Sequence, residues 1–100
     1  MDFIIVNIKE SVANVARMIG YVIIDARENG EYNLVRKLTG NNYPRFHIYL
    51  KAAGDRYVFS LHLDQKVPIY KGVHAHSGEY AGPVVEEEAD RVRQALDKGY

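Results

Sequence analysis

Apolar and polar positions alternate strictly between residues 45 and 64, on both sides of Gly54-Asp55. This period of two predicts a β-hairpin with one apolar and one polar face. The apolar positions are Phe46, Ile48 and Leu50 in the first strand and Tyr57, Phe59, Leu61 and Leu63 in the second. A turn centred on Gly54 and Asp55 creates these pairs on the polar face: Arg45 with Asp64, His47 with His62, and Tyr49 with Ser60. A four-residue turn over residues 52–55 would keep the same faces together, because it shifts the pairing by an even number of residues.

A second hairpin is predicted just upstream. Residues 21–26 and 32–38 flank Asn29-Gly30, a dipeptide typical of type I′ turns, in which both central residues have positive φ. Asp25 and Arg36 interrupt the apolar pattern, so it stays open which face of this hairpin is buried. Residues 39–44 contain Gly, Asn and Pro, which favour a turn before the next strand.

The period changes to that of a helix after Ser11. Ser11 is a favourable N-cap, and Gly20 stands where the residue just past a helix end is expected. The apolar residues between them follow helical spacing: Val12, Val15, Ala16 and Ile19. Upstream, residues 3–8 are apolar and mostly β-branched. They favour a strand, but they also fit an extension of the helix.

A second helix is predicted from Pro83, a residue suited to the first helical position, to Gly99. Its apolar stripe consists of Val85, Ala89, Val92 and Leu96. Acidic residues at 86–88 and 90 crowd its first turns, where they complement the helix dipole. We expect residues 86–88 to be solvated, with an acidic docking patch as the alternative.

Together these elements predict a single α+β domain over residues 1–100. Its antiparallel sheet consists of two consecutive hairpins, with an N-terminal and a C-terminal helix packed on one face and an extra N-terminal strand if residues 3–8 are extended. A chain of 100 residues with 47% hydrophobic residues suits one core. The other face of the sheet is left for a site.

Composition narrows the functional classes. The formal net charge is zero, which counts against a non-specific nucleic-acid binder without excluding a local basic patch. Cysteine is absent, so disulfides and thiolate metal sites are excluded. The longest apolar runs are far below the roughly 20 residues that span a bilayer, and no signal-peptide pattern is present. We therefore expect a soluble cytoplasmic protein that does not associate with membranes.

All four histidines fall in or after the central hairpin. His62 and Asp64 share one side of their strand, and His74 and His76 would share one side of an extended segment, with Glu79 three residues further on. Imidazole and carboxylate ligands in two such pairs suit Zn²⁺ or a similar divalent ion. The stretch 65–82 is a long irregular loop, a kind of segment that is often functional. The alternative is a hydrogen-bonded histidine network that ties this loop to the sheet.

A second hypothesis needs no metal. His47 and His62 could act as general base and general acid in phosphodiester cleavage, with Arg45 stabilising charge on the phosphate. The following residues could add contacts to RNA: Lys51, Arg56 and Lys66 to phosphates, and Tyr43, Tyr49 or Tyr57 by stacking on bases. The alternatives are ordinary sheet packing for the tyrosines and a cross-strand ion pair between Arg45 and Asp64.

The segments MIGYVIIDA and FHIYLKAAGDRYVFSLH, followed by a closing helix, resemble the HicA-type toxins. The shared features are an early helix that ends in a glycine-aromatic step, a histidine at the start of the second strand and another near the end of the third. The resemblance implies a double-stranded-RNA-binding-like fold and RNA as the partner. It also implies that His47 occupies the position of the catalytic histidine in mRNA cleavage.

A third class is a non-catalytic interaction module. In such a module the polar face of the sheet or the loop over residues 65–82 would dock a partner protein. An edge strand and a tyrosine-rich surface suit that role.

Overall fold

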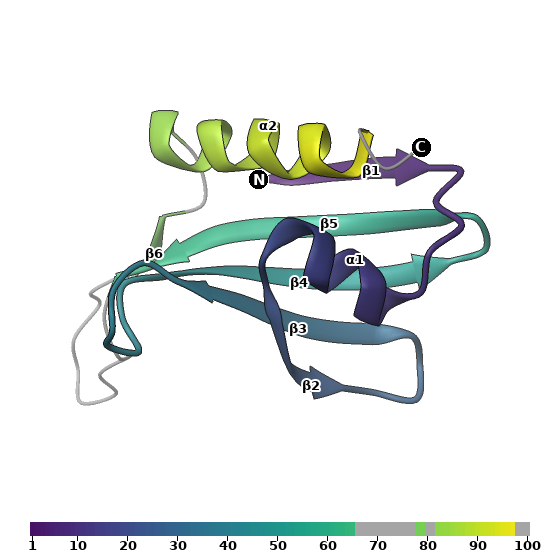
Figure 1. Ribbon diagram of the computed structural model, residues 1–100, viewed down its shortest axis with the longest axis horizontal. Coiled ribbons are helices and arrows are strands. Elements are labelled where there is room, and N and C mark those ends of the chain that lie inside the picture. The colour runs from purple at the N-terminus through teal and green to yellow at the C-terminus, as the bar shows by residue number, and fades with distance from the viewer. Residues whose placement is uncertain (66–77, 80–81, 98–100) are drawn as a thin grey trace.

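The computed structural model describes residues 1–65, 78–79 and 82–97 (Figure 1). The elements along the chain are β1 (Asp2–Val6), α1 (Val12–Ile19), β2 (Val22–Ala26), β3 (Glu31–Lys37), β4 (Arg45–Ala53), β5 (Arg56–Asp64), β6 (Gly78–Glu79) and α2 (Pro83–Asp97). The fold is therefore α+β, and the N-terminal segment is a strand, the preferred of its two predicted conformations. Neither helix in these ranges has the length and apolar character needed to cross a membrane.

The sheet is antiparallel, and its main strands lie in the order β1-β5-β4-β3-β2. The two predicted hairpins are adjacent, because β3 pairs with β4. β1 pairs with residues 56–60 of β5, and β6 pairs with Leu63 and Asp64 of the same strand. β1 and β6 therefore follow one another along one side of β5, while β2 forms the opposite edge of the sheet.

The central hairpin has the predicted register. Its pairs include Arg45 with Asp64, His47 with His62, and Tyr49 with Ser60. The chain reverses at the two residues between β4 and β5, Gly54 and Asp55. Gly54 has a φ of +66°, which residues with an L side chain rarely adopt. Glycine at this position therefore avoids the backbone strain that another residue would have in the turn.

The predicted type I′ turn at Asn29-Gly30 is wrong. Gly30 has a φ of +84°, but Asn29 does not have the positive φ that this turn type needs. The Gly30 N–H instead donates to the Arg27 carbonyl, and the Arg27 N–H donates to the Glu31 carbonyl. The loop therefore has three residues, with the glycine at its left-handed position. Asn29 contributes through its side chain, whose Oδ1 accepts from the Glu31 N–H at 3.2 Å.

Both helices form where the sequence predicts them. Ser11 Oγ accepts from the Asn14 N–H at the start of α1, and Gly20 ends the helix with a φ of +81°. α2 begins at Pro83 and buries its predicted apolar stripe. Its predicted end at Gly99 lies outside the described residues. Glu88 is buried as well, so the expectation that residues 86–88 are all solvated is wrong for Glu88.

The two helices contact each other and pack on the same face of the sheet. The most buried side chains come from all three parts of this layer: Val15 and Ile19 of α1, Val85, Val92 and Leu96 of α2, and Leu34, Ile48, Leu50, Phe59 and Leu61 of the sheet. Burying each large apolar side chain contributes roughly 1.5–3 kcal/mol. This apolar layer holds the helices against one face of the sheet. The opposite face of the sheet carries the residues of the candidate site.

Candidate functional site

Three ligand-type side chains meet on the face of the β4–β5 hairpin that is opposite the helices. His47 and His62 are direct cross-strand partners, and Asp64 follows His62 on the same side of β5. We call His47, His62 and Asp64 the histidine–aspartate cluster. The same register that buries the apolar face of the hairpin therefore builds this cluster.

The Asp64 carboxylate lies between the two imidazoles. Its Oδ2 is 3.2 Å from Nδ1 of His47, and its Oδ1 is 3.1 Å from Nε2 of His62. One ligand atom from each of the three residues lies within 4.8 Å of the other two. Arg45 is the cross-strand partner of Asp64, and its Nε donates to Asp64 Oδ2 at 3.4 Å.

Asn33 on β3 holds the other side of the His47 ring. Its Oδ1 lies 2.9 Å from Nε2 of His47, and its Nδ2 donates to Asp25 at 3.4 Å. Because the amide nitrogen of Asn33 faces Asp25, its oxygen faces the imidazole. Both ring nitrogens of His47 therefore face an oxygen acceptor, Asn33 Oδ1 at Nε2 and the Asp64 carboxylate at Nδ1, and a neutral ring can donate to only one of them. With an ion bound at Nδ1, the Nε2 proton would be donated to Asn33.

Aromatic packing shields the imidazoles. The side chain of Tyr49 stacks against both rings, with centroid distances of 4.5 Å to His47 and 5.3 Å to His62. The two imidazole centroids are 4.8 Å apart. His47 and His62 are only 8% and 5% exposed, whereas Tyr49 is 51% exposed. Tyr49 thus forms part of the boundary between this cluster and solvent.

Burial lowers the pKa of His47 and also that of His62, because it removes water from the charged imidazolium form. The Asp64 carboxylate opposes the shift in both residues. Positive charge opposes protonation: Arg45 acts in this way on His47, and His47 and the N-terminal ammonium act on His62. Both imidazoles are therefore neutral at pH 7, the form that binds metal ions.

The ligand atoms of the cluster lie slightly farther apart than those of a three-residue metal site. Zn²⁺ binds imidazole nitrogen and carboxylate oxygen at about 2.0–2.2 Å, so neighbouring ligand atoms around a tetrahedral ion are about 3.3 Å apart. The two nitrogen–oxygen distances in the cluster, 3.2 and 3.1 Å, are close to that value, but they involve different oxygens of Asp64, and the ligand atoms of the three residues are up to 4.8 Å apart. The side chains would therefore have to move closer together to surround a tetrahedral ion. Two imidazoles and one carboxylate could hold a divalent ion and leave a coordination position for water or substrate.

Some of the predicted site residues come together and others are not described. His47, His62, Asp64 and Arg45 converge as above. The predicted ligands His74 and His76, the side chain of Glu79, and Lys66 lie outside the described residues. Asn33 was not predicted, because it comes from the other hairpin and no local pattern marks it.

Only some of the residues predicted to add contacts to RNA lie near the cluster. Tyr57 points into the helix-covered core, where its hydroxyl donates to the Glu10 carbonyl at 2.7 Å, so its predicted role in stacking on bases is wrong. Tyr43 packs under the Arg45 guanidinium at 4.6 Å. Lys51 lies 3.9 Å from Glu31, and Arg56 is at the other end of the hairpin from the cluster.

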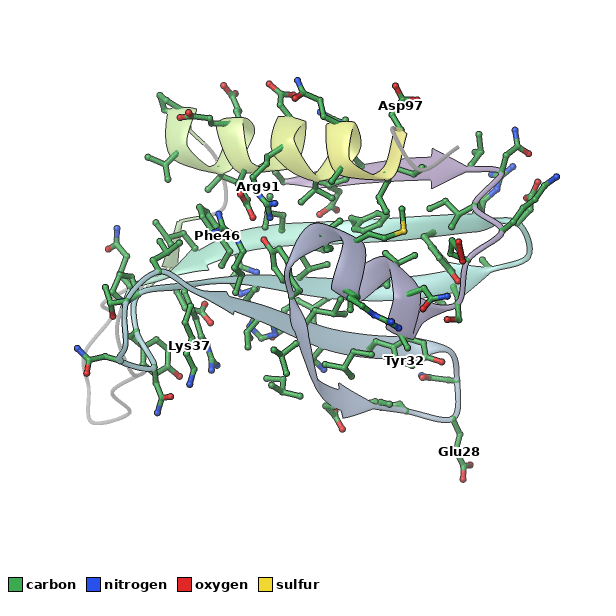
Figure 2. The ribbon with its side chains drawn as sticks, viewed as in Figure 1. Glu28, Tyr32, Lys37, Phe46, Arg91 and Asp97 are labelled. Atoms are coloured by element: carbon green, nitrogen blue, oxygen red, sulfur yellow. The ribbon has the colours of Figure 1, made fainter. Side chains whose placement is uncertain are left out.

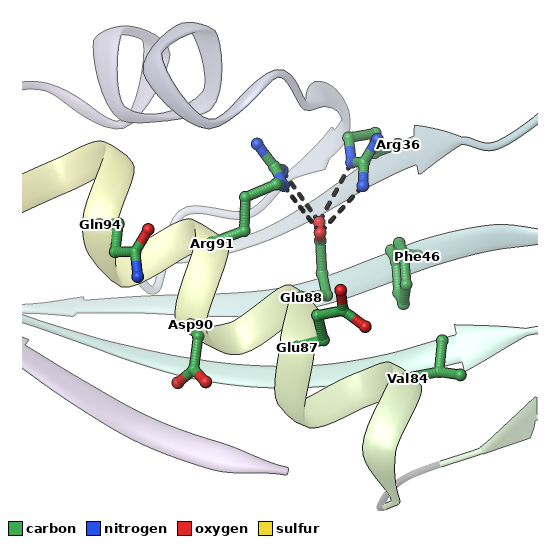
Figure 3. Close-up of a pocket in the computed structure, with 8 residues that line it drawn as sticks. All are labelled: Arg36, Phe46, Val84, Glu87, Glu88, Asp90, Arg91 and Gln94. Carbon is green, nitrogen blue, oxygen red and sulfur yellow. Dashed lines mark hydrogen bonds and ion pairs between the residues drawn. The ribbon is translucent and has the colours of Figure 1, made fainter.

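A second polar cluster lies on the helix side of the sheet (Figure 3). The Glu88 carboxylate of α2 accepts from Arg36 of β3 at 2.9 and 3.1 Å, and from Arg91 at 2.7 and 2.9 Å. The Tyr21 hydroxyl donates to it at 2.6 Å. Arg91 also donates to the Ile19 carbonyl at the end of α1. We call Glu88, Arg36, Arg91 and Tyr21 the glutamate cluster.

Both carboxylate oxygens of Glu88 accept hydrogen bonds from groups that keep their protons at neutral pH. Burial would raise the pKa of Glu88, but hydrogen bonds from Arg91, Arg36 and Tyr21 lower it to about 2. Glu88 itself is 3% exposed. The cluster therefore ties α2 to β3 and α1. It also explains why Arg36 interrupts the apolar pattern of its strand: Arg36 has a buried carboxylate as its partner.

The surface has hollows on both sides of the sheet. One of about 560 Å³ adjoins the glutamate cluster and is lined by Arg36, Phe46, Val84, Glu87, Glu88, Asp90, Arg91 and Gln94 (Figure 3). Another of about 300 Å³ is bordered by Tyr49, Asn33 and Ser60 on the open face. The larger hollow adjoins a cluster with no vacant ligand atom, so volume alone does not locate the chemistry. No residue of the histidine–aspartate cluster lines the smaller hollow, which is separated from His47 by Asn33 and Tyr49.

Comparison with known proteins gave no relative: no family model, curated protein or solved structure matches the chain.

Proposed function

We propose that this protein binds a divalent first-row metal ion, with Zn²⁺ the best fit, through His47 Nδ1, His62 Nε2 and a carboxylate oxygen of Asp64. The observation that carries the proposal is that one ligand atom from each of these three residues lies within 4.8 Å of the other two. His74, His76 and Glu79, which the sequence predicted as ligands, are proposed candidates for a fourth position. With water in that position instead, the ion could act as a Lewis acid.

The environment of the cluster supports this proposal in two further ways. The imidazoles are neutral at pH 7, so an ion need not displace a proton from an imidazolium. Asn33 supplies the oxygen acceptor that metal-binding histidines commonly use at their other ring nitrogen. Arg45 has the opposite effect, because its charge beside Asp64 lowers the affinity for a cation.

Thermal unfolding of chelator-treated protein with added Zn²⁺, Mn²⁺ or Mg²⁺ tests the proposal. Zn²⁺ at about a hundred times its dissociation constant should raise the free energy of unfolding by about 2.7 kcal/mol, which is many degrees for a domain of this size. His62→Gln and Asp64→Asn should abolish the shift. Ser60→Ala, a change on the same strand and face outside the cluster, is the matched control and should keep it.

Two outcomes would contradict metal binding. One is the absence of any stabilisation by the three ions at concentrations up to their solubility limit. The other is an equal shift in the wild type, His62→Gln and Asp64→Asn, which would place the ion elsewhere in the chain.

A second candidate function is metal-independent cleavage of RNA, as the resemblance to HicA-type toxins implies. The observation that favours it is the close approach of two imidazoles beside Arg45. His47 in its neutral form would act as the general base, His62 in its protonated form would act as the general acid, and Arg45 would stabilise the phosphate. RNA cleavage that persists in excess EDTA and disappears in a folded His47→Ala variant would support this function. Cleavage unaffected by His47→Ala would reject it.

A further inference from the structure

The outer edge of β1 has backbone groups without a partner among the described residues. The Met1 ammonium donates to the Leu61 carbonyl, and the Leu61 N–H donates to the Met1 carbonyl, both at 2.8 Å. The backbone N–H and C=O groups of successive residues in an antiparallel strand point to opposite sides. Those of Phe3 and Ile5 therefore also point toward β5, as those of Met1 do. The N–H and C=O groups of Asp2, Ile4 and Val6 therefore point away from the sheet, where β1 is a terminal strand.

This edge lacks the protection found on the opposite edge of the sheet. β2 has a register irregularity between Ile23 and Asp25, and an ion pair between Asp25 and Arg27 follows it at 3.3 Å. Irregular geometry and charge both discourage pairing with another chain. β1 pairs regularly over all five of its residues, and Ile4 and Val6 are 55% and 51% exposed. An exposed, regular and apolar edge is a template for strand addition.

We propose that β1 pairs with β1 of a second copy of this chain, antiparallel about a two-fold axis at Ile4. In this register Ile4 faces Ile4 of the partner subunit, and Asp2 faces Val6 of the partner subunit. These are the positions whose backbone groups point outward, so every outward N–H and C=O of the strand obtains a partner. The arrangement also places no two like charges opposite each other in the strand pair.

Charges on α2 match the same axis. Arg93 lies over the Phe3 ring at 4.5 Å, near the start of β1. Asp97 is one helical turn further on and lines a hollow of about 460 Å³ together with residues 4–8. α2 and β1 run in the same direction (Figure 1), and Asp97 leaves the helix on the side opposite Arg91, which belongs to the glutamate cluster (Figure 2). A two-fold axis at Ile4 therefore brings Asp97 of the partner subunit opposite Arg93.

The second copy is the favoured occupant because the edge and its flanking charges are self-complementary. An isologous interface requires this property, since each surface must match itself after a two-fold rotation. A five-residue strand with flanking helix contacts gives a small interface. We therefore expect a reversible dimer whose population increases with protein concentration.

Sedimentation equilibrium over increasing concentration, into the high micromolar range, tests the proposal. The wild-type mass should rise from that of one chain toward that of two. Ile4→Lys should keep the mass of one chain, with Val6→Lys as the second variant if Ile4→Lys fails to fold. Ile24→Lys on β2 is the matched control, because Ile24 is 51% exposed on the other edge, and its dimer should persist. A wild type that stays monomeric throughout, or a dimer lost only in Ile24→Lys, would overturn the proposal.

Charge reversal tests the position of the axis. Arg93→Asp and Asp97→Arg should each weaken the dimer by at least tenfold, and the double variant should restore it. Circular dichroism and thermal unfolding of each variant would establish that the monomer remains folded, since Arg93 also contacts Asp90 at 3.3 Å. Failure of the double variant to recover the dimer would overturn the axis at Ile4. Capture of a different strand at an Ile4-sensitive edge, with no self-association, would replace the second copy as the occupant.

Discussion

The two polar clusters of this molecule have similar burial but opposite chemistry. In the glutamate cluster, one carboxylate receives hydrogen bonds from two guanidinium groups and a phenol, all of which keep their protons at neutral pH. In the histidine–aspartate cluster, one carboxylate lies between two imidazoles whose neutral form could bind a metal ion. Burial of a charged group therefore does not by itself mark a functional site.

The difference lies in what each carboxylate can still bind. Both oxygens of Glu88 are occupied by donors of fixed charge, so a cation would have to displace an arginine. Asp64 has one arginine contact, which is long at 3.4 Å, and its other neighbours are neutral imidazoles. We interpret the first cluster as structural and the second as a site that can accept a ligand.

The largest expected effect is the loss of the structural cluster. Glu88→Gln removes the charge that compensates Arg36 and Arg91, and breaking a buried pair in this way costs about 3–5 kcal/mol. Urea denaturation of the apo protein would measure this change. Glu87→Gln, one residue earlier on an exposed position of α2, should change stability by less than about 0.5 kcal/mol. Equal effects of the two changes would show that the glutamate cluster does not hold α2 to the sheet.

The same cluster should dominate acid denaturation. The pKa of Glu88 is about 2 in the folded protein and 4.5 in the unfolded chain, so its stabilisation is complete above pH 4.5 and is lost as the pH falls toward 2. The difference corresponds to about 3 kcal/mol. Stability measured by urea denaturation between pH 5 and pH 2.5 should fall less steeply in Glu88→Gln than in Glu87→Gln. Parallel curves for the two variants would assign the acid sensitivity to other carboxylates.

The parts of the fold that sequence predicted are those with local causes. Strict alternation around a two-residue turn determines the register of β4 and β5, and this register placed His47, His62 and Asp64 on one face. The caps at Ser11 and Gly20 likewise act within a few residues. The edge position of β1 was not predicted, because its pairing with β5 joins residues 50 to 58 positions apart, from Val6 with Arg56 to Asp2 with Ser60.

The unpredicted features of the sites are also non-local. Glu88 resembled its exposed neighbours in a run of acidic residues, and its partner Arg36 lies 52 positions away. Asn33 reaches His47 only because β3 pairs with β4 across the turn at residues 39–44, and turn composition does not fix that register. The type I′ turn predicted at Asn29-Gly30 was wrong for a different reason. Asn29 tolerates positive φ but does not require it, so Asn-Gly also fits a three-residue loop.

The smallest expected effect, and the one most specific to the histidine–aspartate cluster, concerns Asn33. If it orients His47 for an ion, Asn33→Ala should weaken Zn²⁺ binding by about 10–100-fold, because the Nε2–H of the ion-bound imidazole loses its acceptor. Titration calorimetry would measure the affinity, and ¹⁵N chemical shifts of the imidazoles would show whether Nδ1 of His47 binds the ion. Asn42→Ala, a change at an exposed position outside the strands, is the matched control. An unchanged affinity would leave Asn33 as a packing contact, and the two clusters would then differ only in their donors and not in how their ligands are oriented.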